Sequence, residues 1–161
     1  MLIGVMSDSH DNMANLAKAV SVFNESCLQY VLHAGDYTSG FTFRILKDLK
    51  AEFIGIFGNN DGDVLLLNKQ SRSRIFRQPH EFTIDGKKFA MIHEHHLVES
   101  IAKSGHYDVL IYGHTHKPEA EMRGSTFVLN PGELCGWLYG KPTVAILDTQ
   151  PPVRARIIEL D

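Results

Sequence analysis

Five short polar segments of this chain carry side chains that could do chemistry, and each follows directly on an apolar run. Their side chains are mainly aspartate, asparagine and histidine, which bind divalent metal ions. About seven such groups recur, more than one ion uses, and structural zinc sites with four ligands rely more on cysteine. The pattern therefore indicates a two-metal hydrolytic site. The segments are Asp8–His10, Gly35–Asp36, Gly58–Asp61, His93–His96 and Gly113–His116.

The apolar runs before these segments predict the strands that must position them. Strands that run in the same direction present their carboxyl ends along one edge of a sheet, where their loops can form one crevice. In the first half we expect strands over Leu2–Met6, Tyr30–Leu32 and Phe53–Phe57. Helical spacing predicts a helix from Asn12 to about Asn24 and another over Phe41–Leu49. This alternation favours a parallel sheet.

The second half of the chain has an antiparallel character. Asp85-Gly86 is a preferred hairpin turn between the expected strands His80–Ile84 and Lys87–Ile92. A helix is expected near Leu97–Lys103. The further expected strands are Val109–Tyr112, Glu119–Met122, Thr126–Leu129, Thr143–Leu147 and Val153–Ile158. Periodicity alone thus predicts a mixed α/β fold.

The five segments together resemble a known family. Read in order as D-x-H, G-D, G-N-x-D, H-x-H and G-H-T-H, they resemble the calcineurin-like metallophosphoesterases, and the compact length resembles their small bacterial and archaeal phosphodiesterase branch. The resemblance extends from Asp8 to the turn at Asn130-Pro131-Gly132. It implies a four-layer αββα sandwich of two mixed β-sheets flanked by helices, in a single domain over residues 1–161.

The resemblance also implies the ligands of two divalent ions per chain. Asp36 would bridge the two ions, because a carboxylate offers two oxygens with several lone pairs. Mixed nitrogen and oxygen ligation favours manganese and also suits nickel, iron, cobalt or zinc, whereas it argues against calcium. The implied ligands are Asp8, His10, Asp36 and His116 for the first ion, and Asp36, Asn59, His93 and His114 for the second.

The assignment of His93 as a ligand has two neighbouring alternatives. The family's T-H-G-H segment selects His93, but this chain has Ile92 and Glu94 in place of the threonine and the glycine. His95 and His96 follow immediately. The sequence therefore leaves open whether His93 or His95 binds the metal.

The expected reaction is hydrolysis of a phosphate ester. Two divalent ions and two carboxylates leave a net charge of about +2, which attracts an anion, and a hydroxide that bridges the ions would be the nucleophile. Relatives with G-N-H-[ED] place a histidine where this chain has Asn60, and a carboxamide cannot act as a general acid. The expected substrates are therefore phosphodiesters or esters with good leaving groups. We assign catalytic roles to Asn60, to His95 as an alternative proton donor, with His96 or water as the other candidates, and to Asp61 as an orienting carboxylate.

Composition limits the location and the partners. The formal net charge of −3 argues against broad attraction to nucleic acid or anionic membranes. Cys27 and Cys135 form no metal or disulfide pattern, the amino terminus lacks a signal-peptide pattern, and no apolar run approaches a membrane span, so we expect a cytoplasmic protein. The expected partner is a small phosphate ester. Small relatives form dimers or higher oligomers, so a homo-oligomer is also possible.

Two other functions compete with a phosphodiesterase. The retromer complex contains a phosphoesterase-like subunit with a degraded metal site, so a catalytically weak interaction scaffold is one alternative. All seven ligand positions are filled here, which argues against it. A small nuclease is the other, and the acidic balance disfavours it. We interpret His33 as packing behind the site, with support of a metal ligand as the alternative. We interpret Asn130-Pro131-Gly132 as a structural turn, after which Glu133 stands where relatives have serine, and Arg72, Arg74 and Arg77 as a solvated loop rather than a substrate-steering patch.

Overall fold

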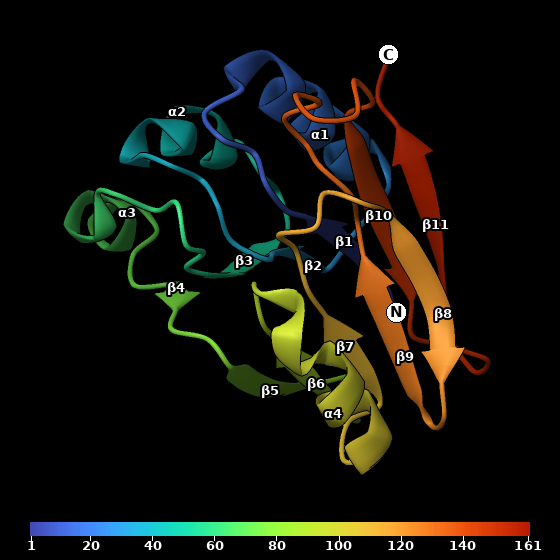
Figure 1. The fold of residues 1–161 in the computed structure, drawn as a ribbon. Coiled ribbons are helices and arrows are strands. Elements are labelled where there is room, and N and C mark those ends of the chain that lie inside the picture. Colours follow the sequence, from blue (N-terminus) through green and yellow to red (C-terminus); the bar gives the residue numbers. More distant parts are fainter.

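Two β-sheets lie face to face between helices in the computed structural model, which describes residues 1–161 (Figure 1). The first sheet has six strands in the order β11 (Arg154–Glu159), β10 (Thr143–Asp148), β1 (Leu2–Met6), β2 (Tyr30–His33), β3 (Glu52–Ile56) and β4 (Ile75–Phe76). The second has five in the order β5 (His80–Ile84), β6 (Lys87–Met91), β7 (Val109–Ile111), β9 (Thr126–Asn130) and β8 (Glu119–Arg123).

Three apolar clusters define four layers. Ile3 and Val5 of β1 meet Phe89 and Ile111 of the second sheet in the core between the sheets. Helices α1 (Met13–Glu25), α2 (Phe43–Leu46) and α3 (Val64–Gln70) contribute to a cluster on the outer face of the first sheet. Helix α4 (Val98–Ser104) covers the outer face of the second. The expected αββα sandwich is confirmed.

Both sheets are mixed, so the expectation of an antiparallel second half was wrong in part. Strands β1, β2, β3 and β4 are parallel, whereas β10 and β11 join them antiparallel. In the second sheet β5 and β6 form the expected hairpin, but β6, β7 and β9 run parallel. The reason is α4, which connects β6 to β7 as a crossover helix and so returns the chain in the same direction.

Helix α1 follows the helical spacing of the sequence. The Asn12 side chain accepts a hydrogen bond from the backbone N–H of Asn15 at 3.2 Å and caps the helix. The residues that the helix buries against the first sheet are Leu16, Ala19, Val20 and Phe23. Capping and periodicity agree here, which explains why this helix could be predicted from sequence.

The region after β2 differs from the sequence prediction. The expected helix over Phe41–Leu49 is a 3₁₀ turn at Gly40–Thr42 followed by the single-turn helix α2, and α3 and β4 were not predicted. The interpretation of Arg72, Arg74 and Arg77 as a solvated loop was wrong in part. Arg74 donates to the Phe53 carbonyl at 3.0 Å and to the Glu52 carboxylate at 3.0 Å, so it fastens the edge strand β4 and does not steer substrate.

None of the helices combines the length and the apolar character that a membrane crossing requires.

Candidate active site

The expected metal ligands lie in loops at the carboxyl ends of strands from both sheets. Asp8 follows β1, Asp36 follows β2 and Asn59 follows β3, while His93 follows β6 and the Gly113–His116 segment follows β7. Three short distances join these loops: His93 Nε2 to Asp36 Oδ2 at 3.3 Å, His116 Nε2 to Asp8 Oδ1 at 3.3 Å, and His10 Nε2 to Asp36 Oδ2 at 3.6 Å. His114 Nδ1 and Asn59 Oδ1 are 2.9 Å apart. All seven expected ligands are therefore gathered at one place.

The backbone of this site is unusual. Left-handed φ angles are uncommon for residues other than glycine, and they persist where the surrounding structure enforces them. The candidate ligands with positive φ are Asp8 (54°), His10 (40°), Asp36 (61°), His114 (66°) and His116 (61°). This clustering is typical of a functional site, because such conformations cost free energy that folding must supply.

Two glycines of the motifs allow the loops to approach one another. A Cβ atom at Gly58 would overlap the Asp36 carboxylate. One at Gly113 would overlap the Ser7 hydroxyl and lie 2.8 Å from Asp8 Oδ2. Any larger residue would push the aspartates away, so these glycines are required by the close packing of the loops.

His93, rather than His95, is placed to bind a metal. His93 is fully buried, and its Nδ1–H donates to the Ala34 carbonyl at 2.7 Å, which leaves the lone pair of Nε2 facing Asp36. Burial opposes protonation, but the nearby carboxylates of Asp36 and Asp8 raise the pKa of His93. His95 is exposed and stacks on the His114 ring, with 5.5 Å between the centroids. The geometry favours His93 as the ligand and places His95 beside it.

His116 is oriented by a carboxylate that the sequence analysis missed. Its Nδ1–H donates to Glu133 Oε2 at 2.7 Å, so Nε2 is free to face Asp8. Glu133 is buried, and hydrogen bonds from His116 and from two backbone N–H groups hold its pKa below the ordinary value in spite of burial. Burial likewise opposes the charge on His116, yet Asp8 and Glu133 raise its pKa to about 11.

Glu133, to which the sequence analysis gave no role, therefore orients His116. Carboxylate partners of this kind fix the tautomer of a metal-binding histidine. No local pattern in the sequence signals this contact, because Glu133 and His116 meet only through the packing of their two loops. Asn130 in the same segment is structural as expected, since its amide donates to the Gly113 carbonyl at 3.0 Å.

Asp61 organises the backbone of the two neighbouring loops. Its carboxylate accepts N–H groups from Tyr37 at 2.7 Å, Thr38 at 2.9 Å, Asp36 at 3.2 Å and Gly58 at 2.7 Å. Burial raises the pKa of this carboxyl group. The contacts are to main-chain atoms, so the orienting role expected for Asp61 is exerted on the loop that carries Asp36.

Asn60 lies against the carboxylate that is expected to bridge the ions. Its backbone N–H donates to Asp36 Oδ1 at 2.8 Å, and its side-chain amide donates to Oδ2 at 2.7 Å. Burial opposes ionisation of Asp36, but the neighbouring His93 and the bonds from Asn60 hold its pKa well below the usual range. Asn60 is exposed, so the same amide could turn to an oxygen of a bound phosphate.

His33 packs behind the site, as expected. Its Nδ1 accepts the Gly35 N–H at 3.2 Å, its Nε2–H donates to the Ser9 hydroxyl at 3.0 Å, and its ring stacks on Tyr37 at 3.8 Å between centroids. Complete burial, reinforced by the nearby His93, lowers the pKa of His33 to about 3. The imidazole is therefore neutral and is held by its packing.

The residues present fit divalent cations. Asp8 Oδ1 and His93 Nε2 are buried without a hydrogen-bond partner, which is costly unless something else satisfies them. Both atoms belong to expected ligands. Asp8, Asp36 and His93 together form one cluster able to hold an ion, and their oxygen and nitrogen donors suit a transition metal.

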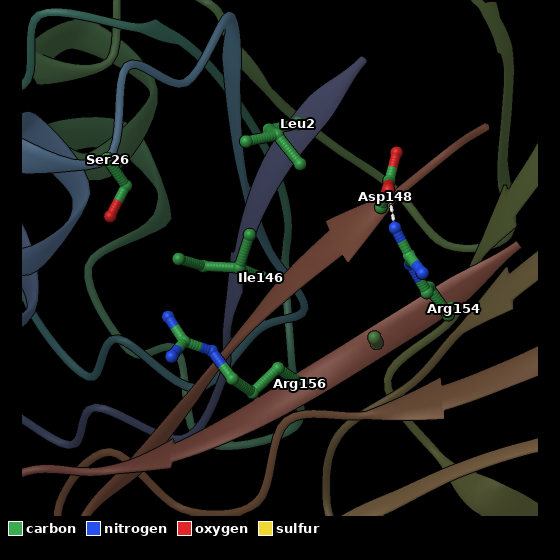
Figure 2. A pocket seen from close by; sticks show the side chains of 7 residues that line it. Leu2, Ser26, Ile146, Asp148, Arg154 and Arg156 are labelled. Carbon is green, nitrogen blue, oxygen red and sulfur yellow. Dashed lines mark hydrogen bonds and ion pairs between the residues drawn. The ribbon is translucent and has the colours of Figure 1, made fainter.

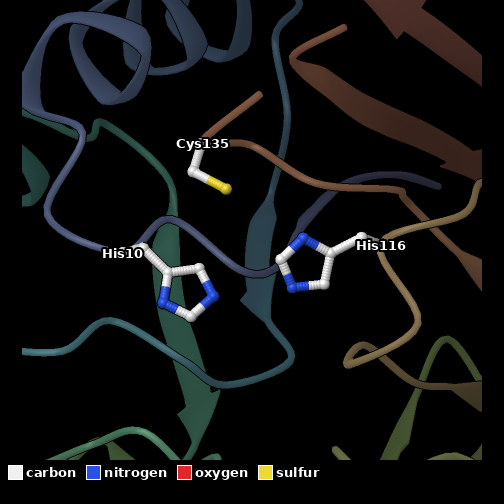
Figure 3. Close-up of side chains that lie close together, drawn as sticks. All are labelled: His10, His116 and Cys135. Atoms are coloured by element: carbon white, nitrogen blue, oxygen red, sulfur yellow. The ribbon is translucent and has the colours of Figure 1, made fainter. Parts of the chain in front are cut away.

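A second cluster contains His10, His116 and Cys135 (Figure 3). The Cys135 thiol donates to Glu133 Oε2 at 3.6 Å, the same oxygen that accepts His116 Nδ1–H. The sulfur therefore hydrogen-bonds to the carboxylate that holds the Nδ1 side of His116, whereas the Nε2 atom of His116 faces Asp8. We accordingly do not count Cys135 among the ligands.

A shallow pocket beside Leu2, Ile146 and Arg156 lies apart from this site (Figure 2). Leu2 begins β1, whereas Asp8 follows the other end of the same strand. Within the pocket Arg154 pairs with Asp148 at 3.0 Å, which neutralises one of its charges. The pocket contains none of the candidate residues.

Comparison with known proteins agrees with this geometry. The family model for the calcineurin-like phosphoesterase superfamily domain matches residues 1–151. A phosphodiesterase of Methanocaldococcus jannaschii is 42% identical over 156 residues, which are 93% of this chain and 94% of that protein. A phosphodiesterase of Escherichia coli K12 is 26% identical over 144 residues, which are 80% of this chain and 76% of that protein. The solved structure of an archaeal phosphodiesterase superposes with a TM-score of 0.94 at 41% identity, covering 99% of this chain and 100% of that one.

Proposed function

The chain belongs to the calcineurin-like phosphoesterase superfamily, and from this premise we propose that it is a metal-dependent phosphodiesterase acting on small phosphate esters. One observation carries the proposal. Seven candidate oxygen and nitrogen ligands lie in loops at the carboxyl ends of strands, and two of their buried atoms, Asp8 Oδ1 and His93 Nε2, have no hydrogen-bond partner. A protein that served only as a scaffold would gain nothing from such unsatisfied atoms.

The ligands divide into two sets around one carboxylate. We assign Asp8, His10 and His116 to one ion and Asn59, His93 and His114 to the other, with Asp36 shared. The approach of Asp36 to both His10 at 3.6 Å and His93 at 3.3 Å supports this assignment. When bound, two divalent ions would activate water as the nucleophile and neutralise charge that develops on the phosphoryl group. Oxygen and imidazole donors without thiolate favour manganese, with iron, cobalt, nickel or zinc as other candidates.

The protein side chains perform the other tasks. Glu133 and the Ala34 carbonyl fix the tautomers of His116 and His93, so that each Nε2 faces the centre. The Asn60 amide, which donates a hydrogen bond to Asp36, is also placed to donate to a phosphate oxygen. Because an amide cannot protonate a leaving group, the site favours substrates whose leaving oxygen is stable as an anion.

The free thiols of Cys27 and Cys135 support a reducing location, and we propose the cytoplasm. Nucleic acid is an unfavoured substrate for a chain with a net charge of −3, since phosphate backbones require positive charge along their path.

An activity screen tests the proposed function. The chelated protein, reconstituted with manganese, should hydrolyse bis(p-nitrophenyl) phosphate and lose this activity when chelator is added again. Asp48→Asn is a matched control for aspartate variants of the site, because Asp48 is exposed and lies outside the ligand loops. Cleavage of single-stranded DNA at a comparable rate would favour a nuclease instead. Absence of turnover on every ester with the metal bound would contradict the proposal.

A further inference from the structure

An exposed aromatic turn stands beside the candidate metal centre. Trp137 is 64% exposed, Leu138 67% and Tyr139 51%, and the tryptophan is the only one in the chain. Large apolar side chains grouped on a surface commonly mark a binding site. The question is what this group would bind.

The indole continues a row of rings that begins among the ligands. His10 and His116 stack with 5.4 Å between their centroids and 22° between their planes. Trp137 lies next to His10, with 6.0 Å between the centroids and an angle of 24°. Trp137 therefore borders the centre on the side of the first ion, and more than half of its surface is free for a ligand.

The turn is anchored to the metal-binding loops. Glu133, which orients His116, also accepts the N–H groups of Leu138 at 2.9 Å and Tyr139 at 2.6 Å. The Cys135 N–H donates to the Asp8 carbonyl at 3.0 Å. These bonds fix the backbone of the turn relative to the ligands, and the stacking of Trp137 on His10 places the indole beside the centre.

Positive charge accompanies the aromatic rings. Lys117 follows the ligand His116 directly, and its Nζ lies 5.7 Å from the centroid of the Tyr139 ring. An anionic group at the centre and a planar apolar group on the turn would thus meet complementary surfaces. A phosphate that carries an aromatic substituent has both parts.

We propose that Trp137 is a specificity-determining residue, which stacks on a planar aromatic substituent of the phosphate ester. The inference rests on the proposed function for the phosphate subsite, and it adds the chemical class of the group attached to that phosphate. Nucleobases and simple aryl groups share the required flat π-face, and stacking of a base on an aromatic side chain tolerates many sequences and ring types.

Matched ligand pairs test this directly, because the single tryptophan reports its own contact by fluorescence. The protein is loaded with zinc, a closed-shell ion, and titrated with adenosine 5′-monophosphate or ribose 5-phosphate, which carry the base or a hydroxyl group at C1 of the ribose. Phenyl phosphate and ethyl phosphate form the second pair, which places the ring directly on the phosphate. The aromatic member of at least one pair should quench the fluorescence and bind about 5-fold to 100-fold more tightly.

Variants separate stacking from a merely structural role of the turn. With bis(p-nitrophenyl) phosphate as the reporter substrate, Trp137→Ala should remove the advantage of the aromatic inhibitor while inhibition by the non-aromatic partner stays unchanged. Trp137→Phe should restore most of the advantage, and Leu138→Ala, an equally exposed neighbour, should retain it.

Equal affinity within both pairs for the wild-type protein would overturn the inference, as would a Trp137→Ala variant with an undiminished aromatic advantage. The fluorescence titration requires no turnover. A protein that hydrolyses no ester yet discriminates the pairs would therefore contradict the proposed function without contradicting the stacking.

Discussion

Two regions of the candidate site differ in how firmly they are held. The buried floor, defined as Asp8, Asp36, His93 and His116, has exposed fractions between 0% and 9%. The exposed rim, defined as Asn60, His95 and Trp137, faces the solvent. Floor residues are fixed by carbonyls, carboxylates and left-handed backbone, whereas the rim has fewer such constraints.

The difference indicates that the floor holds the metal ions and that the rim contacts the substrate. Burying polar atoms without partners costs free energy, so the floor is built for ions that satisfy them. Rim residues are free to meet substrates of different shapes. Substitutions in the floor should therefore change metal content first, and substitutions in the rim should change rate or specificity while metal is retained.

Asp36→Asn should have the largest effect. The substitution removes the charge of the proposed bridging residue, which faces both His10 and His93. Metal activation is worth several kcal/mol, so turnover of a diester should fall by about 1,000-fold or more. The measurement compares Asp36→Asn with Asp48→Asn at saturating manganese. Full activity with both ions retained would contradict the role of Asp36.

His93 and His95 offer a direct comparison of floor with rim. His93→Ala removes a buried ligand and should lower metal affinity by more than about 100-fold. His95→Ala should keep the metal content, because the His95 ring only stacks on His114. The rate should fall by about 10-fold if His95 donates a proton or a hydrogen bond to the substrate. Metal titrations of both variants, with the exposed His106→Ala as a control, would check this. Reversed behaviour would show that His95 is the ligand.

Asn60→His tests whether the rim lacks a general acid. The native protein should favour aryl over alkyl esters, and the variant should raise turnover of alkyl phosphomonoesters by about 100-fold. Asp36 is the carboxylate that contacts position 60, whereas Asp61 is engaged with backbone N–H groups, so Asp36 would orient the new imidazole. The measurement is a leaving-group series on both proteins. If the native protein shows no dependence on leaving-group basicity with chemistry rate-limiting, another residue donates the proton.

The smallest effect should come from His33, which packs behind the floor. It concerns the stability of the fold rather than the activity. The pKa of His33 is about 3 in the folded chain and 6.5 when unfolded, so the unfolded state binds the extra proton between these values. The free energy of unfolding should therefore fall by about 2 kcal/mol through His33 between about pH 7.5 and pH 5. Denaturant titrations of the chelated protein should show that loss, and His33→Gln should lack it. Identical pH dependence of the two proteins would exclude this origin.

The floor could be predicted from sequence better than the contacts that support it. Each ligand segment follows an apolar strand, so local patterning placed Asp8, Asp36 and His116 at a common edge. Glu133 reaches His116 only through the packing of distant loops, and no local pattern encodes that contact. The expected helix over Phe41–Leu49 failed for a similar reason. After α2 ends, the side chain of Asn24 on α1 binds the Asp48 carbonyl and the Lys50 N–H, a contact between distant segments.

The central claim is that the floor and its neighbouring ligands hold two divalent ions, and a metal count tests it most directly. The purified chain is stripped with chelator, reconstituted with manganese and analysed for bound metal, with the thermal midpoint measured in parallel. We predict two ions per chain, and a rise in stability of roughly 2.7 kcal/mol for each site at a hundredfold excess over its dissociation constant. One tightly bound ion or none, with a midpoint that chelator does not change, would contradict the account.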